Sequence, residues 1–338
     1  MIDLATSYLG LQLTGPVIAS AGPMTGRMDD LLRLQEAGAS AAVLPSLFEE
    51  EAIAEERSLH EALTKAVPSS AERLNSVHHP GFPGLGPERH VRLVEEAKRR
   101  LSIPVIASVN AARAGAWERY AALMVEAGAD AIELNIYAMA TDPGRAAADV
   151  EAEYLEVIQR TRAVVEVPLS VKLSPYFSSL PHQASAAVQA GADGLVLFNR
   201  YYPPRLNLRT LAAEPAIHMS MPNDLRLPLR WLPVLRPQLP GTSLAVSSGV
   251  DSLRDLLTVL LVGADVACMT SAVLRHGPEH VRVVLDGLTA CLDENEYESV
   301  TQLRGLAGGD SDNDTDRGSR DRADYVEALS RFQPIVPV

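Results

Sequence analysis

The sequence is poor in cysteine and in aromatic residues, and it contains no long hydrophobic run. Its two cysteines, Cys268 and Cys291, follow neither disulfide nor metal-ligand spacing, as is typical of a reducing compartment. No stretch approaches the roughly 20 apolar residues that span a bilayer, and the N-terminus lacks the basic and apolar regions of a signal peptide. We therefore expect a cytoplasmic protein without a membrane partner.

Basic residues are in deficit as well. Lys and Arg total 30 against 43 Asp and Glu, which gives a formal net charge of −13. An acidic surface repels phosphate backbones, so nucleic acid is not expected as a partner. The content of 47% hydrophobic and 22% charged residues is that of a globular protein, and 338 residues fit a single barrel domain.

The strongest organisational signal is a sequence pattern that occurs four times, and we call each occurrence an echo. Four times, an amphipathic segment ends in a small-residue turn that runs directly into an apolar strand. The four segments are EAGASAAVL (36–44), EAGADAIEL (126–134), QAGADGLVL (189–197) and LVGADVACM (261–269). Glycine ends the helix in each because it tolerates a positive φ. A helix that closes onto a strand in this way is half of a βαβ unit.

Four further apolar runs lie between these echoes, at 16–22, 103–111, 167–175 and 243–250. Eight strands that alternate with helices predict an α/β fold, a (β/α)8 TIM barrel over residues 1–306. An open doubly wound sheet is the alternative, although no GxGxxG follows the first strand. Residues 307–323 are polar and predict a disordered linker, followed by a tail at 324–338 whose short helix docks on the barrel.

Two long insertions interrupt the repeat, at 48–86 and 201–241. Both follow predicted strands, so both fall at the C-terminal face of the barrel, where active-site covers are built. The first insertion is a candidate lid. Both can also be decoration without chemistry.

Polar residues within the predicted strands mark a site. Strand 132–137 alternates apolar residues with Glu133, Asn135 and Tyr137, and strand 169–174 does so around Lys172. With Asn199 after the sixth strand, these side chains converge at the C-terminal mouth. A buried ammonium requires an anionic partner, which for Lys172 is either a reduced flavin ring or a carboxylate such as Glu133.

Small polar residues follow the last two strands, as SSGV (247–250) and MTSA (269–272). The loops after the last two strands of a barrel often form a phosphate site from backbone N–H groups. Ser248, Gly249, Thr270 and Ser271 suit that task. His276 and His280 share the i,i+4 spacing of metal ligands but lack a third ligand, so we predict no metal site.

Together with ASAGP at 19–23, these features resemble the FMN site of the dihydroorotate dehydrogenase family. The resemblance covers nearly the whole chain, through YLGLQLTGPVIASAGP, AERLNSV, ELNIY, VKLSP, LFN, VSSGV, SAV and YVEAL. It implies FMN as cofactor and oxidation of dihydroorotate to orotate in pyrimidine biosynthesis, with a proton leaving C5 and a hydride passing from C6 to flavin N5. The FMN-binding residues that it implies are Ala19, Ser20, Ala21, Asn110, Lys172, Ser248, Gly249, Thr270 and Ser271. The substrate-binding residues that it implies are Asn75, Asn135 and Asn199.

The chain departs from the family where substrate is deprotonated. The family carries Asn-x-Ser-(Cys or Pro)-Pro-Asn after strand four, and a cysteine or serine acts as base. Here the stretch reads NIYAMA, with Ala138 at the cysteine position and Ala140 at the second asparagine. A family lysine aligns with Pro45, and a Ser or Thr aligns with Arg200. Because alanine cannot accept a proton, Tyr137 is the nearest candidate for a catalytic base by position. The other candidates are Ser174, Ser178, Ser179, His78 and His79.

Three functions are consistent with this pattern. The first is an FMN-dependent oxidoreductase acting on dihydroorotate, or on another small carbonyl or alkene substrate whose carboxylate meets Arg200 or Arg205. The second is a barrel enzyme without flavin that binds a phosphorylated metabolite. The third is a non-catalytic subunit that passes electrons to a redox partner protein. In each case the other expected partners are a small molecule and a second copy of the chain, as a homodimer.

Overall fold

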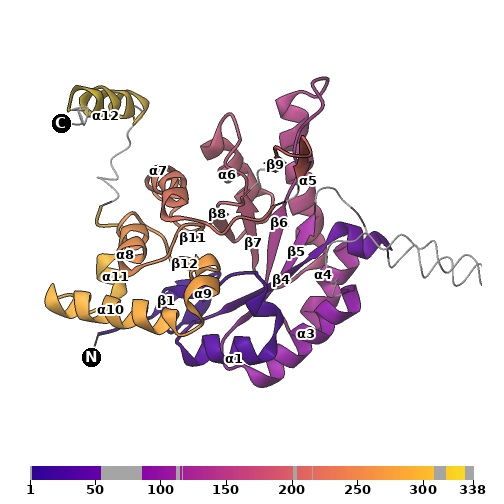
Figure 1. The fold of residues 1–338 in the computed structure, drawn as a ribbon, viewed down its shortest axis with the longest axis horizontal. Helices are drawn as coiled ribbons and strands as arrows, with labels where there is room; N and C mark the ends of the chain where they lie inside the picture. The colour runs from indigo at the N-terminus through magenta and orange to yellow at the C-terminus, as the bar shows by residue number, and fades with distance from the viewer. Residues whose placement is uncertain are drawn as a thin grey trace, which may run out of the picture. The chain divides into compact units, whose positions relative to one another are not determined.

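The structure is a computed structural model and describes residues 2–54, 86–111, 115, 117–200, 204–214, 216–307 and 317–331. Eight parallel strands close into a barrel in the order β11-β12-β3-β4-β5-β6-β7-β8 (Figure 1). They are β3 (Val17–Ala19), β4 (Ala42–Phe48), β5 (Val105–Ala111), β6 (Ala131–Ile136), β7 (Leu169–Leu173), β8 (Gly194–Leu197), β11 (Ser243–Ser247) and β12 (Val266–Met269). The TIM barrel predicted from the repeat is confirmed, strand by strand.

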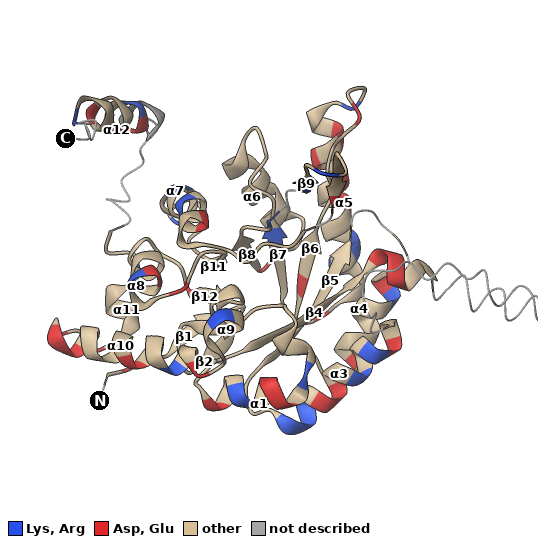
Figure 2. Ribbon diagram, in the orientation of Figure 1, with Lys and Arg blue, Asp and Glu red and all other residues tan. Residues whose placement is uncertain are grey.

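Helices connect successive strands and surround the barrel. They are α1 (Met28–Glu36), α3 (Pro87–Arg100), α4 (Trp117–Glu126), α5 (Ala147–Val164), α6 (Leu180–Gln189), α7 (Arg226–Leu235), α8 (Leu253–Leu261), α9 (Ser271–His276), α10 (His280–Glu294) and α11 (Val300–Leu303). Figure 2 shows charged residues gathered on outer helices such as α1 and α3, whereas the strands carry few. Among the described residues, no helix is both long enough and apolar enough to cross a bilayer.

The fourfold echo has a structural explanation. Each echo glycine has a positive φ and ends its helix, with φ of 101° at Gly38, 100° at Gly128, 119° at Gly191 and 105° at Gly263. The residue two positions after each of these glycines forms a hydrogen bond with the first or second residue of the strand that precedes the helix. These bonds are Ser40 Oγ to Val17 O at 2.9 Å, Val105 N to Asp130 Oδ2 at 2.7 Å, Leu169 N to Asp193 Oδ2 at 2.8 Å and Leu244 N to Asp265 Oδ2 at 2.7 Å. In each echo, the turn before one strand is therefore hydrogen-bonded to the start of the strand that precedes it in the chain.

The N-terminal end of the barrel interior is filled by a hairpin that the sequence patterns did not predict. It consists of β1 (Thr6–Tyr8) and β2 (Leu11–Leu13). Tyr8, Leu9 and Leu13 pack against the inward side chains of the strands. Thr6 Oγ1 donates to Asp265 O, and the Leu9 N–H donates to Ser243 Oγ at 2.8 Å. In the described part of the chain, the C-terminal mouth is the end of the barrel that borders a cavity.

The insertion after the sixth barrel strand forms a second hairpin and a short helical turn before α7. Its elements are β9 (Arg205–Asn207), β10 (Ala212–Glu214) and the 3-10 helix η3 (Pro222–Leu225). Most of the other insertion, at 48–86, lies outside the described residues. The lid predicted there therefore stays a prediction.

The chain divides into two compact units, Met1–Gly308 and Gly309–Val338. The second unit contains α12 (Arg317–Arg331), which begins within the segment that we predicted as a linker and extends into the predicted tail. Residues 308–316 lie outside the described part of the chain. Docking of the tail helix on the barrel stays a prediction.

Candidate active site

Three polar residues lie at one level on adjacent strands near the mouth. Asn110 on β5 pairs with Asn135 on β6, and Asn135 pairs with Lys172 on β7. All three side chains are half-buried. This row arises because an in-register parallel sheet carries the inward positions of neighbouring strands to one height. The structure thus brings together three of the residues that the sequence singled out.

Asn199 completes the row on the far side of Lys172. Its Nδ2 donates to Asn135 Oδ1 at 2.6 Å. A side-chain amide pair leaves each partner with further donors and acceptors. Two of the three asparagines assigned to the substrate are therefore in direct contact, while Asn75 lies outside the described residues.

Lys172 is paired with a carboxylate inside the barrel. Its Nζ lies 3.6 Å from Glu133 Oε1, with side-chain exposures of 12% and 1% respectively. Within the described part of the chain no hydrogen bond reaches Glu133 Oε1, so the ammonium is the charge that compensates it. Of the two partners that we considered for Lys172, the structure contains Glu133. The ammonium still borders the mouth, because its exposed fraction is the larger.

Cys268 on β12 lies in the same interior. Burial, and after it the nearby Glu133 carboxylate, raise the pKa of its thiol to about 12. The Lys172 ammonium and a hydrogen bond with Ser20 act in the opposite direction. Cys268 therefore stays a neutral thiol at physiological pH and does not serve as a nucleophile.

The predicted phosphate loops face each other across the ends of β11 and β12. Ser248 and Gly249 both have positive φ, 79° and 85°. Such a conformation is uncommon for serine and is retained where the surroundings require it. On the opposite side, a Cβ on Gly22 would lie 2.6 Å from Thr270 Cγ2, which shows how closely the first strand approaches. We call Ser248, Gly249, Thr270 and Ser271 the small-residue cup.

A third segment, residues 220–225, packs against this cup. The Ser220 N–H donates to Ser271 Oγ at 2.8 Å. A Cβ on Gly249 would lie 2.6 Å from Leu225 N and 3.0 Å from Met221 O. The second insertion thus reaches the cup from above, as expected of an active-site cover.

We call Asn110, Asn135, Lys172 and Asn199 the amide row. A cavity of about 250 Å³ touches this row at Asn199 and the small-residue cup at Ser248. The remaining lining residues are Pro175, Tyr176, Phe198, Arg200, Asp224, Leu227, Pro228 and Ser247. Arg200 Nη1 donates to His218 O at 2.9 Å, and its Nη2 lies 3.4 Å from Asp224 Oδ2.

The remaining predicted residues lie at or near the mouth. Ala19 and Ser20 are buried and Ala21 is half-buried, at and just beyond the end of β3. Tyr137 is half-buried directly after β6, and its N–H donates to Ala111 O at 3.2 Å. The catalytic role of Tyr137 stays a prediction.

Pro45, which aligns with a family lysine, lies in an irregularity of β4. The pairing of β4 with β5 shifts register between Val43 and Ser46. Proline has no N–H to donate, so a bulge is where a barrel strand tolerates it. Beyond the bulge, the hydroxyls of Ser46 and Ser108 lie 2.7 Å apart. A neutral hydroxyl pair is thus the polar group nearest to Pro45 along this strand pair.

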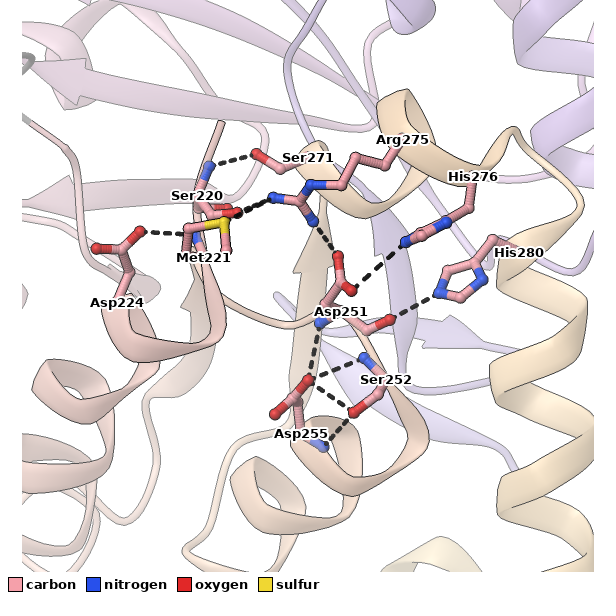
Figure 3. A network of polar contacts seen from close by, with 10 residues as sticks. All are labelled: Ser220, Met221, Asp224, Asp251, Ser252, Asp255, Ser271, Arg275, His276 and His280. Atoms are coloured by element: carbon pink, nitrogen blue, oxygen red, sulfur yellow. Dashed lines mark hydrogen bonds and ion pairs between the residues drawn. The ribbon is translucent and has the colours of Figure 1, made fainter. Parts of the chain in front are cut away.

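Sequence reasoning missed Arg275, whose guanidinium contacts both the Asp251 carboxylate and the Ser220 carbonyl (Figure 3). Arg275 lies four residues after Ser271, beyond the MTSA motif, which ends at Ala272. His276 and His280, considered as a metal pair, both contact Asp251 instead. Among the described residues, no group of three or more His, Cys, Asp or Glu side chains is arranged to hold a metal ion.

Residues 3–203 match the family described as dihydroorotate dehydrogenase. The catalytic subunit of dihydroorotate dehydrogenase B (NAD(+)) from Methanothermobacter thermautotrophicus is 28% identical over 313 residues, covering 90% of this chain and 98% of that protein. Its counterpart from Thermoplasma volcanium is 24% identical, with 91% and 99% covered. The NAD-dependent dihydropyrimidine dehydrogenase subunit PreA of Escherichia coli is 26% identical over 220 residues, covering 60% of this chain and 53% of that protein.

The family match covers more than half of the chain and includes the whole amide row. The relatives match almost end to end, so the cup at the ends of β11 and β12 lies within the similarity. Barrel, mouth and comparisons agree, and the chain belongs to the dihydroorotate dehydrogenase family as a dihydroorotate dehydrogenase-like oxidoreductase.

Proposed function

We propose that this chain binds FMN and oxidises or reduces a CH–CH bond of a small substrate, with the oxidation of dihydroorotate to orotate as the first reaction to test. One observation carries the proposal. A cavity at the barrel mouth is lined by Asn199 of the amide row and by Ser248 of the small-residue cup. A ligand with a polar ring at one end and a phosphate at the other matches this arrangement.

The donor set fits FMN. The cup offers small side chains and two positive-φ residues, Ser248 and Gly249, which let the backbone approach a phosphate closely. At the other end, the Lys172 ammonium and the Asn110 amide suit the polar edge of the flavin ring. The first-strand residues Ala19, Ser20 and Ala21 supply small groups against which a ring can lie. When bound, FMN supplies the acceptor or donor of a hydride.

The substrate would lie over the asparagine pair. The 2.6 Å hydrogen bond between Asn199 and Asn135 uses one donor of one amide and one acceptor of the other, and a side-chain amide has two donors and an oxygen with two lone pairs, which suits a small ring that carries carbonyl and N–H groups. Oxidation of a CH–CH bond also releases a proton, and Tyr137 is the side chain that we assign to receive it. Asn75 would approach from the segment outside the described residues.

The anaerobic visible spectrum of the purified, FMN-loaded protein tests this proposal. Addition of dihydroorotate should bleach the oxidised flavin bands promptly. Tyr137→Phe should slow the bleaching while FMN stays bound. A protein that binds FMN but stays oxidised with dihydroorotate would remove this substrate and keep the flavoprotein.

Arg200 favours a second candidate within the same class, a flavoprotein that acts on another small carbonyl or alkene. The guanidinium borders the cavity and is shared between Asp224 and the His218 carbonyl. A substrate carboxylate can replace the Asp224 contact bidentately. Arg200→Ser returns the family type of residue, so we expect it to weaken turnover of carboxylate-bearing substrates and leave FMN binding intact. Unchanged selectivity would exclude this role.

The partners and the location follow from the same proposal. We infer a cytoplasmic enzyme that takes a small-molecule substrate, forms a homodimer and transfers electrons to an acceptor or a redox partner protein. Relatives named as subunits support a partner protein. A flavin that exchanges electrons with a partner without turning over any small substrate would instead indicate a non-catalytic electron-transfer subunit.

A further inference from the structure

Arg275 connects three separate segments at the small-residue cup (Figure 3). It lies on α9, the helix that begins at Ser271, four residues further along the chain. Its guanidinium donates to the carboxylate of Asp251, which follows the β11 loop, and to the backbone carbonyl of Ser220 in the insertion. Through this one side chain, segment 220–225 is connected both to the loop after β11 and to α9, which follows β12.

Asp251 is held from several directions, so it offers Arg275 a fixed anchor. His276 Nε2 lies 3.5 Å from Asp251 Oδ2, and His280 Nε2 lies 2.6 Å from the Asp251 carbonyl oxygen. The Asp251 N–H donates to Asp255 Oδ2 at 3.2 Å. A guanidinium is a planar fork of fixed geometry, so fixing its carboxylate also fixes where its remaining donors point. Here those donors point at Ser220.

Segment 220–225 has few other attachments to the cup. Its Met221 N–H is used locally, by Asp224 Oδ2 at 2.9 Å. Ser220 also donates to Ser271 Oγ, and Arg200 reaches Asp224 from the end of β8. Yet the fit against Gly249 is close, since a Cβ there would lie 2.6 Å from Leu225 N. A small displacement of the segment would therefore change the shape of the cup.

We propose that Arg275 is a positioning residue that holds segment 220–225 against the small-residue cup and thereby sets the affinity for the phosphate end of the flavin, without contacting the phosphate itself. This inference rests on the proposed function, because it takes the cup as the phosphate site. The Asp251 carboxylate compensates the guanidinium charge, which leaves geometry as its contribution. The distinguishing consequence is selectivity: loss of Arg275 should weaken FMN binding and leave riboflavin, which lacks the phosphate, almost unaffected.

The test compares dissociation constants for FMN and riboflavin, measured by flavin fluorescence quenching with the full-length apoprotein. Arg275→Met should weaken FMN binding by about tenfold to a hundredfold, as expected for loss of a charge-assisted hydrogen bond, and change riboflavin binding less than about twofold. Arg275→Lys keeps the charge but not the fork and should also weaken FMN binding, with little risk to folding.

Asp251→Ala separates positioning from direct attraction. If Arg275 acts through geometry, removal of its anchor should weaken FMN binding as Arg275→Met does. If Arg275 instead attracts the phosphate directly, the uncompensated charge should strengthen FMN binding, and that result would overturn the proposal. Equal losses for FMN and riboflavin, or no loss in Arg275→Met, would overturn it as well.

Arg236 provides a matched control at the opposite end of the barrel. Its side chain is 23% exposed, against 22% for Arg275, and it also joins a carboxylate, that of Asp265, to backbone carbonyls, those of Gly263 and Thr242. Arg236→Met should lower the melting temperature and leave the FMN-to-riboflavin affinity ratio unchanged. A wild-type protein that binds riboflavin and FMN equally would refute the phosphate site itself, and with it both the proposed function and this inference.

Discussion

Removal of Lys172 should destabilise the barrel, because it would leave a buried carboxylate without its cation. The two charges lie 3.6 Å apart, and Glu133 is only 1% exposed. Coulomb's law with an effective dielectric constant of about 20 gives an attraction of about 5 kcal/mol at this distance. Loss of one partner from such a buried pair costs about 3 to 5 kcal/mol, and we expect Lys172→Met to fall in that range.

The double variant Lys172→Met/Glu133→Gln should recover most of this loss. It removes both charges, and neutral replacement of a buried ion pair is often close to neutral in stability. Urea unfolding of the apoprotein, followed by circular dichroism, gives the free energies for the full double-mutant cycle. We expect each single variant to be less stable than the double variant by at least about 2 kcal/mol.

Arg100→Met is the surface control. Arg100 pairs with Glu96 at 3.1 Å, but both side chains are more than 40% exposed, so its loss should change stability by no more than about 0.5 kcal/mol. A dependence of Glu133 on Lys172 would be excluded if Lys172→Met cost as little stability as this control, or if the effects of the two single changes simply added in the double variant. Either result would mean that Glu133 does not depend on Lys172.

Three further changes test other parts of the site. Gly249→Ala should destabilise the protein and weaken FMN binding, because it combines a φ of 85° with a Cβ placed 2.6 Å from a backbone nitrogen. Gly10→Ala is the control: at a φ of 74° with nothing within 4 Å of the added Cβ, it should show the strain of positive φ alone. Equal melting temperatures for the two variants would contradict this. Cys268 has a pKa of about 12 in the fold against an ordinary 9.0, so the folded state retains its proton longer, and the stability it contributes is complete below pH 9 and lost as pH rises toward 12. At pH 10.5 this loss amounts to about 2 kcal/mol, and urea titrations at pH 8 and 10.5 should show a correspondingly smaller pH effect in Cys268→Ala than in wild type. Asn199→Ala removes the donor to Asn135 and should cost about 1 to 3 kcal/mol in urea unfolding and weaken substrate binding more than FMN binding; a selective loss of FMN would reassign this residue to the cofactor.

The barrel could be predicted from the sequence because its signals are local. The helix-ending glycines, such as Gly128, precede buried strands at regular intervals, and their positive φ is a requirement of the turn itself. The alternation of Glu133 and Asn135 with apolar residues likewise determines which side chains face inward. These patterns depend only on near neighbours, so one sequence suffices to recognise them.

The contacts that sequence patterns did not predict are those between distant segments. Arg275 is 55 residues away from its acceptor Ser220 and 24 from Asp251, and nothing in the local pattern of α9 marks it. The N-terminal hairpin escaped notice because Tyr8 and Leu13 belong to strands of only three residues each. The bulge at Pro45 could not be predicted either, because a proline in an apolar run can also end a strand.

Reconstitution with FMN is the most direct test of the central claim, that the mouth of this barrel is a flavin site. The purified protein would be incubated with excess FMN and passed through a gel-filtration column, and the absorbance of the protein peak recorded. We expect flavin bands in the protein peak at about one FMN per chain, and a clear loss of that flavin in Lys172→Met. A colourless protein peak, with all FMN eluting as the free small molecule, would contradict it.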